Sequence, residues 1–545
     1  MTSDLLTFFT SLTNLAVVPV VGAIVVMLLR IIAPDQKQLA RYVTLAFSLV
    51  VLVQVVVIFF VYTTGQCPMG NVAVDPNAAG SPFVFACQQQ SPFFPLVNST
   101  WHVGIDGLSA AMLLLTGILT PLAILISFEV TDNVHEHMAL FLFLEMGLIG
   151  VFISLDLLFF FIFWEIGLVP MYFLINIWGG ANRRYASFKF FLYTMGGSLG
   201  LLLAIQVITV ATGTMDIPTL LSVWPKTLNA AGQPLTLPFG ASIGTVKAIA
   251  FLAFFIAFAI KVPIWPFHTW LPDAHTEAPT AGSMLLAGVL LKLGAYGFLR
   301  LVIPLFPAEA QAFAPVIAVL AVLGIILGAF AAWGQNDFKR LVAYSSVNHM
   351  GFVVLGIAAF AAVYNTIITH GVTTAETMRS VTMATNGAVL QMFNHGLSSA
   401  GMFLLVGALY HKAHTRDLTQ FGGLWTLAPV YGGLLVFTSM ASLGLPGLNG
   451  FVSEFQVVAG TWWIYPVYVA LSMIGLLVTG AYILKGVRAV LHGPVNEHLR
   501  GHHLEIEIRE VIALAPLAAL MLITGIWPNW ILPVINQTVT RLFGS

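Results

Sequence analysis

The chain has 545 residues, of which 59% are hydrophobic and only 8% are charged, and its mean hydropathy is +0.94. Soluble globular domains carry about 25% charged residues, so this composition excludes an ordinary soluble protein. The net charge of -1 gives no indication of a nucleic-acid partner. We therefore interpret the chain as an integral membrane protein.

Long apolar runs follow one another through the sequence. A membrane-spanning helix needs roughly 20 such residues, and by this criterion the chain contains about fourteen helices. Asp4 precedes the first run where a cleaved signal would have basic residues, so we expect that run to be retained as a helix. The predicted spans lie near residues 15–33, 41–62, 108–128, 138–154, 157–178, 190–211, 247–269, 281–302, 313–333, 340–363, 387–410, 426–462 with a break, 465–490 and 510–533.

The order of the spans predicts an all-α fold with an internal repeat. Two stretches of five helices, roughly 138–302 and 313–490, each contain an interrupted helix at the fourth position, and an odd number of spans makes the repeats inverted. The longest loops, near 63–103 and 213–245, are rich in Pro, Gly, Asn and Gln and are expected to cap the bundle. The predicted units are an N-terminal part at 1–137, the two repeats at 138–302 and 303–492, and a C-terminal helix within 493–545.

Proline and glycine interrupt both fourth helices. In AFAIKVPIWPFHTWLPDAH, Pro263 and Pro266 lack an N–H group, which predicts that the carbonyls of Ala259 and Val262 have no helical partners. In SLGLPGLNGFVSEF, Pro446 lies among three glycines. Broken helices at matching positions of inverted repeats are typical of transporters with ion sites at mid-membrane. The alternative is that proline and glycine are simply more frequent in membrane helices.

The positive charges predict how the chain is oriented, because Lys and Arg accumulate on the cytoplasmic side of a membrane protein. Both termini then face outward, as does the loop with Cys67 and Cys87, where an oxidising compartment permits a disulfide. Two free thiols remain an equal alternative. One side holds Arg30, Lys37, Arg41, Arg183, Arg184, Lys189, Lys339, Arg340, Lys412, Arg416, Arg488, Arg500 and Arg509, and the other holds Lys226, Lys247, Arg300, Arg379 and Arg541.

Several ionisable residues lie deep inside the predicted spans, where a charged side chain costs about 2.5 to 3.5 kcal/mol unless a partner or water meets it. A buried ammonium next to a movable carboxylate forms a proton switch, because a charge pair at 4 Å is worth about 4 kcal/mol at an effective dielectric of 20. Histidine suits intermediate positions, since it can accept a proton on one ring nitrogen and release one from the other. The predicted proton relay consists of Glu165, Lys261, Lys292, His349, His395 and Glu454.

Other readings of these residues stay open. A lone buried histidine is often a packing residue, and a buried lysine can belong to a structural salt bridge. Glu145 is a secondary candidate, either for the relay or as a lateral partner, and Asp156 is expected to be an exposed helix N-cap. His268 is another secondary candidate. With Asp273, His275 and Glu277 it either lines an opening or belongs to a solvated loop.

The sequence contains no motif that supports metal or cofactor binding. It has no CxxC pair, no cysteine cluster for iron and sulfur, no credible histidine pair for haem and no glycine-rich dinucleotide turn. We therefore expect no cofactor and no metal in this chain, and any redox step to occur elsewhere.

Long stretches of the sequence resemble a known family. They are FWEIGLVPMYFLINIWGG, IKVPIWPFHTWLPDAHTEAPTAGSMLLAGVLLKLGAYG, YSSVNHMGF, NHGLSSAGMFLLVGALY and GLPGLNGFVSEF. They resemble the antiporter-like proton-translocating subunits of respiratory complex I, and among them the branch called chain M in bacteria and chain 4 in mitochondria. Glu454 favours this branch, because the other antiporter-like chains usually have a lysine in the second broken helix. The end of the chain soon after its last span favours it over chain L, which continues into a lateral helix.

The resemblance implies roles for the candidate residues. Glu165 resembles the carboxylate that pairs with Lys261, Lys292 with His349 or His395 resembles the central relay, and Glu454 resembles the terminal site of the second half. It implies a subunit of a proton-pumping NADH:quinone oxidoreductase in an energy-transducing membrane, either a bacterial plasma membrane or an organellar inner membrane.

The resemblance also implies what surrounds the chain. Its partners would be lipids and the other membrane-arm subunits, and NADH, flavin, iron–sulfur clusters and quinone would be bound by partner subunits. The alternatives are a subunit of a multisubunit sodium/proton antiporter, a subunit of a membrane-bound hydrogenase, and a purely structural scaffold.

Overall fold

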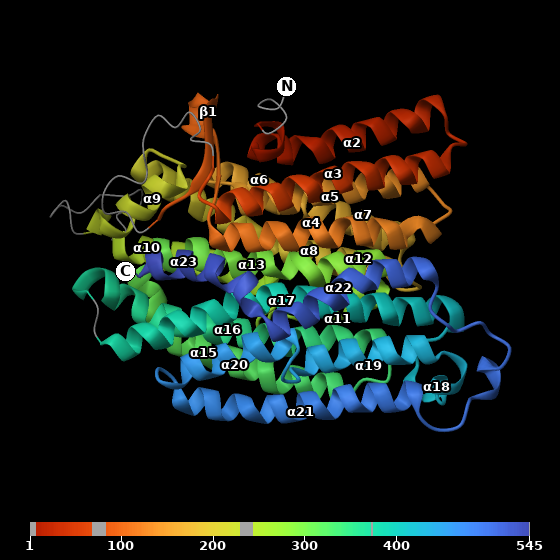
Figure 1. Cartoon of the computed structure of the whole chain (residues 1–545). Helices are drawn as coiled ribbons and strands as arrows, with labels where there is room; N and C mark the ends of the chain where they lie inside the picture. The colour runs from red at the N-terminus through yellow and green to blue at the C-terminus, as the bar shows by residue number, and fades with distance from the viewer. Residues whose placement is uncertain (1–6, 68–82, 229–242, 372–373, 544–545) are drawn as a thin grey trace.

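The computed structural model describes residues 7–67, 83–228, 243–371 and 374–543. Within these ranges the chain forms a bundle of helices whose axes run in one common direction (Figure 1). Thirteen helices of the described residues are long and apolar enough to cross a membrane, and a shorter apolar helix, α19 (Pro429–Leu443), is followed by α20 (Asn449–Trp462). The broken pair completes the predicted set of about fourteen passages. The all-α polytopic fold is therefore confirmed.

The N-terminal part contains the only strands of the described residues. Strands β1 and β2 form an antiparallel hairpin, with Ala86 opposite Ile105 at its open end. A disulfide joins Cys67 to Cys87 at the start of β1. The loop near 63–103 thus contains a disulfide-linked hairpin that its polar composition did not predict. Residues 68–82 of this loop lie outside the described residues. The elements are α2 (Leu12–Ile32), α3 (Lys37–Thr63), β1 (Ala86–Phe94), β2 (Ser99–Ile105) and α4 (Gly107–Ile126).

The first five-helix stretch follows the predicted order. One passage, Thr280–Leu305, is completely buried and alternates between α-helical and π-helical turns. Part of the second long loop, residues 229–242, lies outside the described residues. The elements are α5 (Val134–Ile153), α6 (Leu157–Ile166), α7 (Leu168–Trp178), α8 (Arg183–Thr212), α9 (Ile217–Val223), α10 (Ile243–Lys261), α11 (Trp270–Glu277), α12 (Thr280–Leu285), the π-helical η5 (Leu286–Leu290), α13 (Leu291–Gly297), the π-helical η6 (Phe298–Val302) and α14 (Ile303–Leu305).

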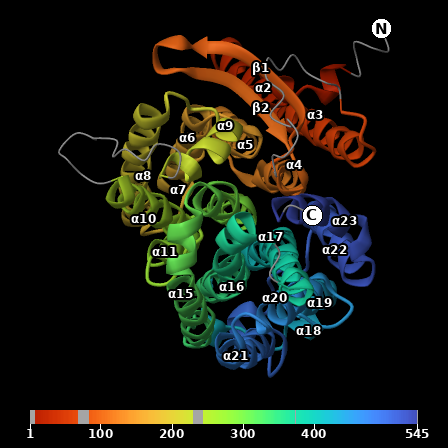
Figure 2. The ribbon, with the colours of Figure 1, turned by 90° about the vertical axis from the view of Figure 1, so that its left-hand side faces the viewer.

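The second stretch surrounds a long central helix. The most apolar window of this helix, α17 (Ala375–Ala413), is entirely buried, and the helix lies in the middle of the bundle in Figure 2. With 39 residues it is about 58 Å long, so it extends well beyond a hydrocarbon layer of about 30 Å. The remaining helices are α15 (Pro307–Trp333), α16 (Phe338–His370), α18 (Leu424–Leu427), α21 (Pro466–Leu491), α22 (Ile508–Ile526) and α23 (Leu532–Leu542).

Helix α23 was not predicted. Five of its residues recur on one face and are buried against α4 and α17: Val534, Ile535, Thr538, Val539 and Leu542.

Short 3-10 turns connect several of the helices. The 3-10 turns are η1 (Pro95–Val97), η2 (Ser127–Glu129), η3 (Pro225–Leu228), η7 (Leu418–Gln420), η8 (Glu497–Leu499) and η9 (Pro528–Trp530).

Both predicted helix breaks are present. Helix α10 ends at Lys261, and the chain resumes as α11. The expectation that the Ala259 carbonyl lacks a partner is wrong, because it accepts from the N–H of Ile264 at 2.8 Å. The neighbouring Ile260 carbonyl accepts from the Trp270 indole at 2.9 Å. One residue of slippage therefore replaces the bond that Pro263 removes, and the Trp270 side chain replaces the bond that the slippage takes from Ile260.

Candidate functional site

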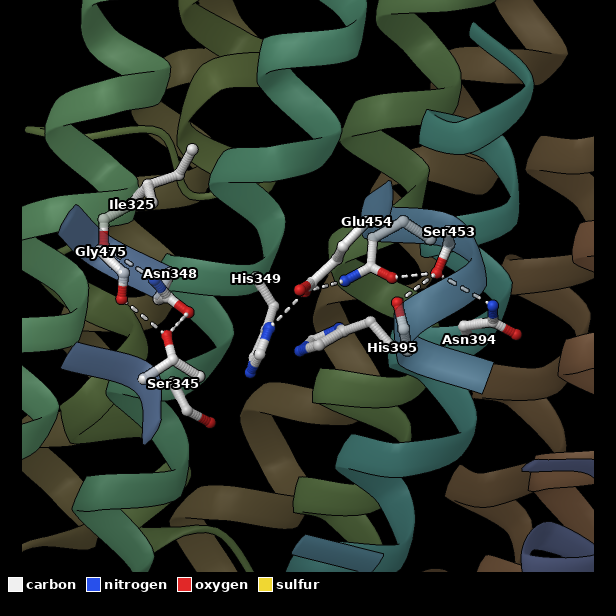
Figure 3. A network of polar contacts seen from close by, with 12 residues as sticks. Ile325, Ser345, Asn348, His349, Asn394, His395, Ser453, Glu454 and Gly475 are labelled. Carbon is white, nitrogen blue, oxygen red and sulfur yellow. Dashed lines mark hydrogen bonds and ion pairs between the residues drawn. The ribbon is translucent and has the colours of Figure 1, made fainter. Parts of the chain in front are cut away.

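Four of the predicted relay residues lie next to one another in the buried centre of the bundle. Lys292 Nζ is 2.8 Å from His395 Nδ1, and His349 Nδ1 is 2.8 Å from Glu454 Oε1. The rings of His395 and His349 are neighbours, with their centroids 5.8 Å apart and their planes tilted by 41°. Each of the four residues is at most 5% exposed. Figure 3 shows His395, His349 and Glu454 converging from α17, α16 and α20. We call Lys292, His395, His349 and Glu454 the central row.

A π-helical turn positions the first member of the row. Lys292 follows the segment η5, and its ammonium donates to the carbonyl of Ala287 within that segment as well as facing His395. A π-helical turn is wider than an α-helical one and is frequent at functional sites. The wider turn brings a backbone carbonyl within reach of the buried ammonium.

The second helix break positions the last member of the row. Gly444 has a φ of +83° and ends α19, and Glu454 Oε2 lies 3.6 Å from where a Cβ on Gly444 would be. The Glu454 carboxylate also accepts from Gln391 Nε2 at 2.7 Å. Gln391 in turn accepts from Ser453 Oγ at 2.6 Å, which fixes its amide. The break therefore leaves space for a carboxylate that side-chain donors stabilise.

Asparagine side chains fix the helices on which the row depends. Asn394 and Asn449 each donate to the other's backbone carbonyl, at 2.8 and 3.1 Å, and so join α17 to α20. Asn348 donates to the Ile325 carbonyl at 2.7 Å and accepts from Thr479 at 3.0 Å. Buried side-chain hydrogen bonds of this kind between helices fix their relative positions.

Tyr482 is a neighbour of the row that the sequence did not indicate. Its hydroxyl lies 3.2 Å from His349 Nε2, so both ring nitrogens of His349 have a partner. Gln391 was missed as well. Their only signal was a polar atom in an otherwise apolar helix, which is common at helix contacts.

The first half of the relay has a different geometry. Lys261 is 2% exposed, and its ammonium lies 4.7 Å from the ring centre of Trp164. Glu165 follows Trp164 in the sequence and attracts the Lys261 ammonium electrostatically. In the described part of the chain, however, no ion pair within 4 Å joins Glu165 to Lys261. One oxygen of Glu165 is buried without a hydrogen-bond partner. The aromatic face, rather than the carboxylate, is the closest described partner of this ammonium.

The secondary candidates lie apart from the central row. Glu145 is completely buried in α5 and accepts from Ser48 of α3 at 2.9 Å, while its other oxygen lacks a partner. It therefore faces α3. His268 is half-buried between α10 and α11, with its ring 6.3 Å from that of Tyr344 and its Nδ1 without a partner.

Two environments differ from expectation. Asp156 does cap α6, but it is fully buried and accepts from Ser99 at 3.0 Å, and burial raises its pKa from the usual value. The segment with His275 is not a solvated loop but the helix α11, in which His275 is fully buried and stacks on Phe403 with ring centres 4.4 Å apart. Its neighbour Asp273 is paired with Lys189 at 2.6 Å.

A second polar cluster lies at the end of the bundle that carries the hairpin. Arg300 forms a buried ion pair with Asp106, and His102 lies 2.6 Å from Asp216. Burial alone would raise the pKa of the Asp216 carboxyl, but the hydrogen bonds with His102 and Thr219 and the charge of His102 together outweigh it, so the pKa is lowered. These pairs join β2 and the start of α4 to the first five-helix stretch.

Comparison with known proteins assigns the chain to a family. The family described as NADH:quinone oxidoreductase/Mrp antiporter, TM, matches residues 154–382 and 364–479. The chain is 40% identical over 443 residues to NADH-quinone oxidoreductase subunit M of Rhodobacter capsulatus, covering 81% of this chain and 82% of the relative. The chain belongs to this family. The subunit M of Escherichia coli K12 is 39% identical over 83% of this chain and 84% of its own length.

Two solved structures agree with the fold. A chain of respiratory complex I from Thermus thermophilus superposes with a TM-score of 0.77 and 26% identity, covering 97% of this chain and 99% of that chain. A chain of the Mrp complex from Dietzia superposes with a TM-score of 0.76 at 18% identity, covering 98% and 97% of the two chains. At 18% identity this likeness shows the fold alone. It therefore does not favour the alternative that the chain is a subunit of a sodium/proton antiporter.

Proposed function

We propose that this chain is a proton-translocating membrane-arm subunit of a proton-pumping NADH:quinone oxidoreductase. The observation that carries the proposal is the central row, in which four exchangeable side chains follow one another inside the bundle. A purely structural ion pair would need only two of them. The likeness to subunit M of two bacteria supports the same assignment.

The hydrogen bonds of the row suggest how protons move. When the Lys292 ammonium donates to His395, the proton can pass to Nδ1 while the ring releases another from Nε2, which has no partner among the described residues. The 5.8 Å between the histidine rings then needs a ring reorientation or one bridging water. His349 can accept at Nε2 and release from Nδ1 to the Glu454 carboxylate.

Lys261 and Glu165 supply the control step in this proposal. If Glu165 approaches, it stabilises the ammonium, and if it withdraws, Lys261 retains only the face of Trp164 and releases its proton more readily. Moving one charge against 100 mV takes about 2.3 kcal/mol. A change of a few kcal/mol at this pair is therefore sufficient, and quinone reduction in neighbouring subunits would supply it.

The setting of the chain follows from the same proposal. The neighbours would be the other antiporter-like subunits, and flavin, iron–sulfur clusters, NADH and quinone would be bound by partner subunits. The excess of Lys and Arg at one end of the bundle supports a cytoplasmic or equivalent location for that end, with both termini outward, in an energy-transducing membrane.

Replacement of Lys261 by Ala tests the proposal. We expect Lys261→Ala in the assembled complex, reconstituted in liposomes, to abolish acidification driven by quinone reduction while subunit assembly survives. Lys247→Ala is the matched control, since Lys247 is a buried lysine of the same helix that donates to the Pro225 carbonyl at 3.1 Å, far along α10 from the break. Wild-type pumping by an assembled Lys261→Ala complex would discard the assignment.

A further inference from the structure

A surface groove lies away from the central row, where the C-terminal end of α21 meets the end of α15. It has a volume of about 750 Å³ and is lined by Trp333, Leu418, Phe421 and residues of α21 and the loop after it. Three of its lining residues are basic, Lys485, Arg488 and His492, and none is acidic. Lys485 and Arg488 are three residues apart and share one face of α21, and His492 is the residue that caps its C-terminal end. We call this cavity the basic groove.

The charges of the basic groove are not neutralised within the chain. Lys485 donates to the carbonyls of Trp333 and Gln335, both at 2.7 Å, and thereby fixes the end of α15. Among the described residues, no acidic side chain forms an ion pair with any of the three basic residues. Arg488 and His492 are exposed, and Arg488 is free to present its planar fork to an anion.

An apolar surface leads along α21 to the basic groove. The helix exposes large apolar side chains at positions that recur with helical spacing, from 42% to 78% of their surface. Trp333, at the edge of the groove, is 48% exposed, and tryptophan is enriched where a membrane span meets the headgroups. The exposed stripe consists of Val467, Leu471, Ile474, Leu477 and Leu484.

We propose that the basic groove binds the phosphate of an anionic phospholipid, whose acyl chain lies along this stripe. Lys485 and Arg488 bring positive charge to a phosphate, and Arg488 suits it in geometry, because a guanidinium donates two parallel hydrogen bonds to phosphate oxygens. The continuous apolar stripe favours a lipid over a soluble anion, which would need no such surface. This site does not depend on the proton relay and lies outside it.

Photocrosslinking of the whole complex tests the site. The complex is reconstituted with phosphatidylglycerol that carries a photoreactive acyl chain, and labelled peptides are identified by mass spectrometry. We expect labelling of α21 near Leu484 to fall about tenfold in Arg488→Gln, because a charge-assisted pair of bonds is lost. Arg488→Lys should retain part of the labelling. Arg184→Gln, an exposed arginine at the same end of the bundle but outside the groove, should label as the wild type does.

Three kinds of outcome would overturn the proposal. The first is equal labelling by photoreactive phosphatidylcholine, or unchanged labelling in an assembled Arg488→Gln complex. The second is complete displacement of the lipid by millimolar inorganic phosphate, which would make the groove a site for soluble anions. The third is that a photoreactive amino acid in place of Leu484 crosslinks to a neighbouring subunit instead of a lipid.

Discussion

The two broken helices occupy matching positions in the two halves of the chain but surround their ionisable groups differently. Glu454 beside the second break has two hydrogen-bonded partners, His349 and Gln391, whereas Lys261 beside the first lies against the ring of Trp164. A buried carboxylate needs donors, while an ammonium can rest on an aromatic face. One architecture thus provides a connected row that ends beside the second break and a separable pair beside the first.

Among changes that break the connected row, the largest effect is expected at Lys292. Lys292→Met removes the exchangeable group, and Lys292→Arg keeps the charge but cannot release a proton, because the pKa of an arginine exceeds 12. We expect both variants to lose at least about tenfold in proton pumping, equivalent to about 1.4 kcal/mol in the barrier. The measurement is acidification of liposomes by the reconstituted complex. Pumping by Lys292→Arg at the wild-type rate would show that the charge alone suffices.

A smaller effect is expected at Tyr482, which contacts the row without being one of its proton carriers. Tyr482→Phe removes the hydroxyl from His349 Nε2, a hydrogen bond worth about 1 kcal/mol, so we expect pumping to fall by about fivefold at most. The pH dependence of pumping should change as well, since His349 loses one of its two partners. The control is Tyr431→Phe, because Tyr431 is buried in the same half and its hydroxyl donates to the Leu405 carbonyl at 3.3 Å. Identical pH profiles for the two variants would show that the Tyr482 hydroxyl has no specific effect on proton transfer through His349.

Much of the fold was predictable from the sequence because apolar length determines membrane spans and proline determines where they break. The candidates for the central row were predictable for a related reason, since lysine, glutamate and histidine are costly at hydrocarbon depth. The hairpin at Ala86–Ile105 was not predicted, because its first strand contains the polar run Gln88, Gln89 and Gln90 rather than an alternating pattern.

The contacts within the site were less predictable than its members. Tyr482 and Gln391 come from helices far apart in the sequence and carry no charge that marks them as unusual. The separation of Glu165 from Lys261 depends on how α6 packs against α10, which residue spacing does not determine. The satisfied carbonyl of Ala259 shows that a backbone can slip by one residue to recover a bond that proline removes.

The central claim is that the buried row exchanges protons during turnover, and infrared difference spectroscopy of the working complex tests it most directly. The account predicts that the Glu454 carboxyl becomes transiently protonated when quinone is reduced. The corresponding carbonyl band should be absent in Glu454→Gln and should not appear in Lys292→Met. A Glu454 carboxylate that stays ionised throughout turnover in a complex that pumps at the normal rate would contradict the account.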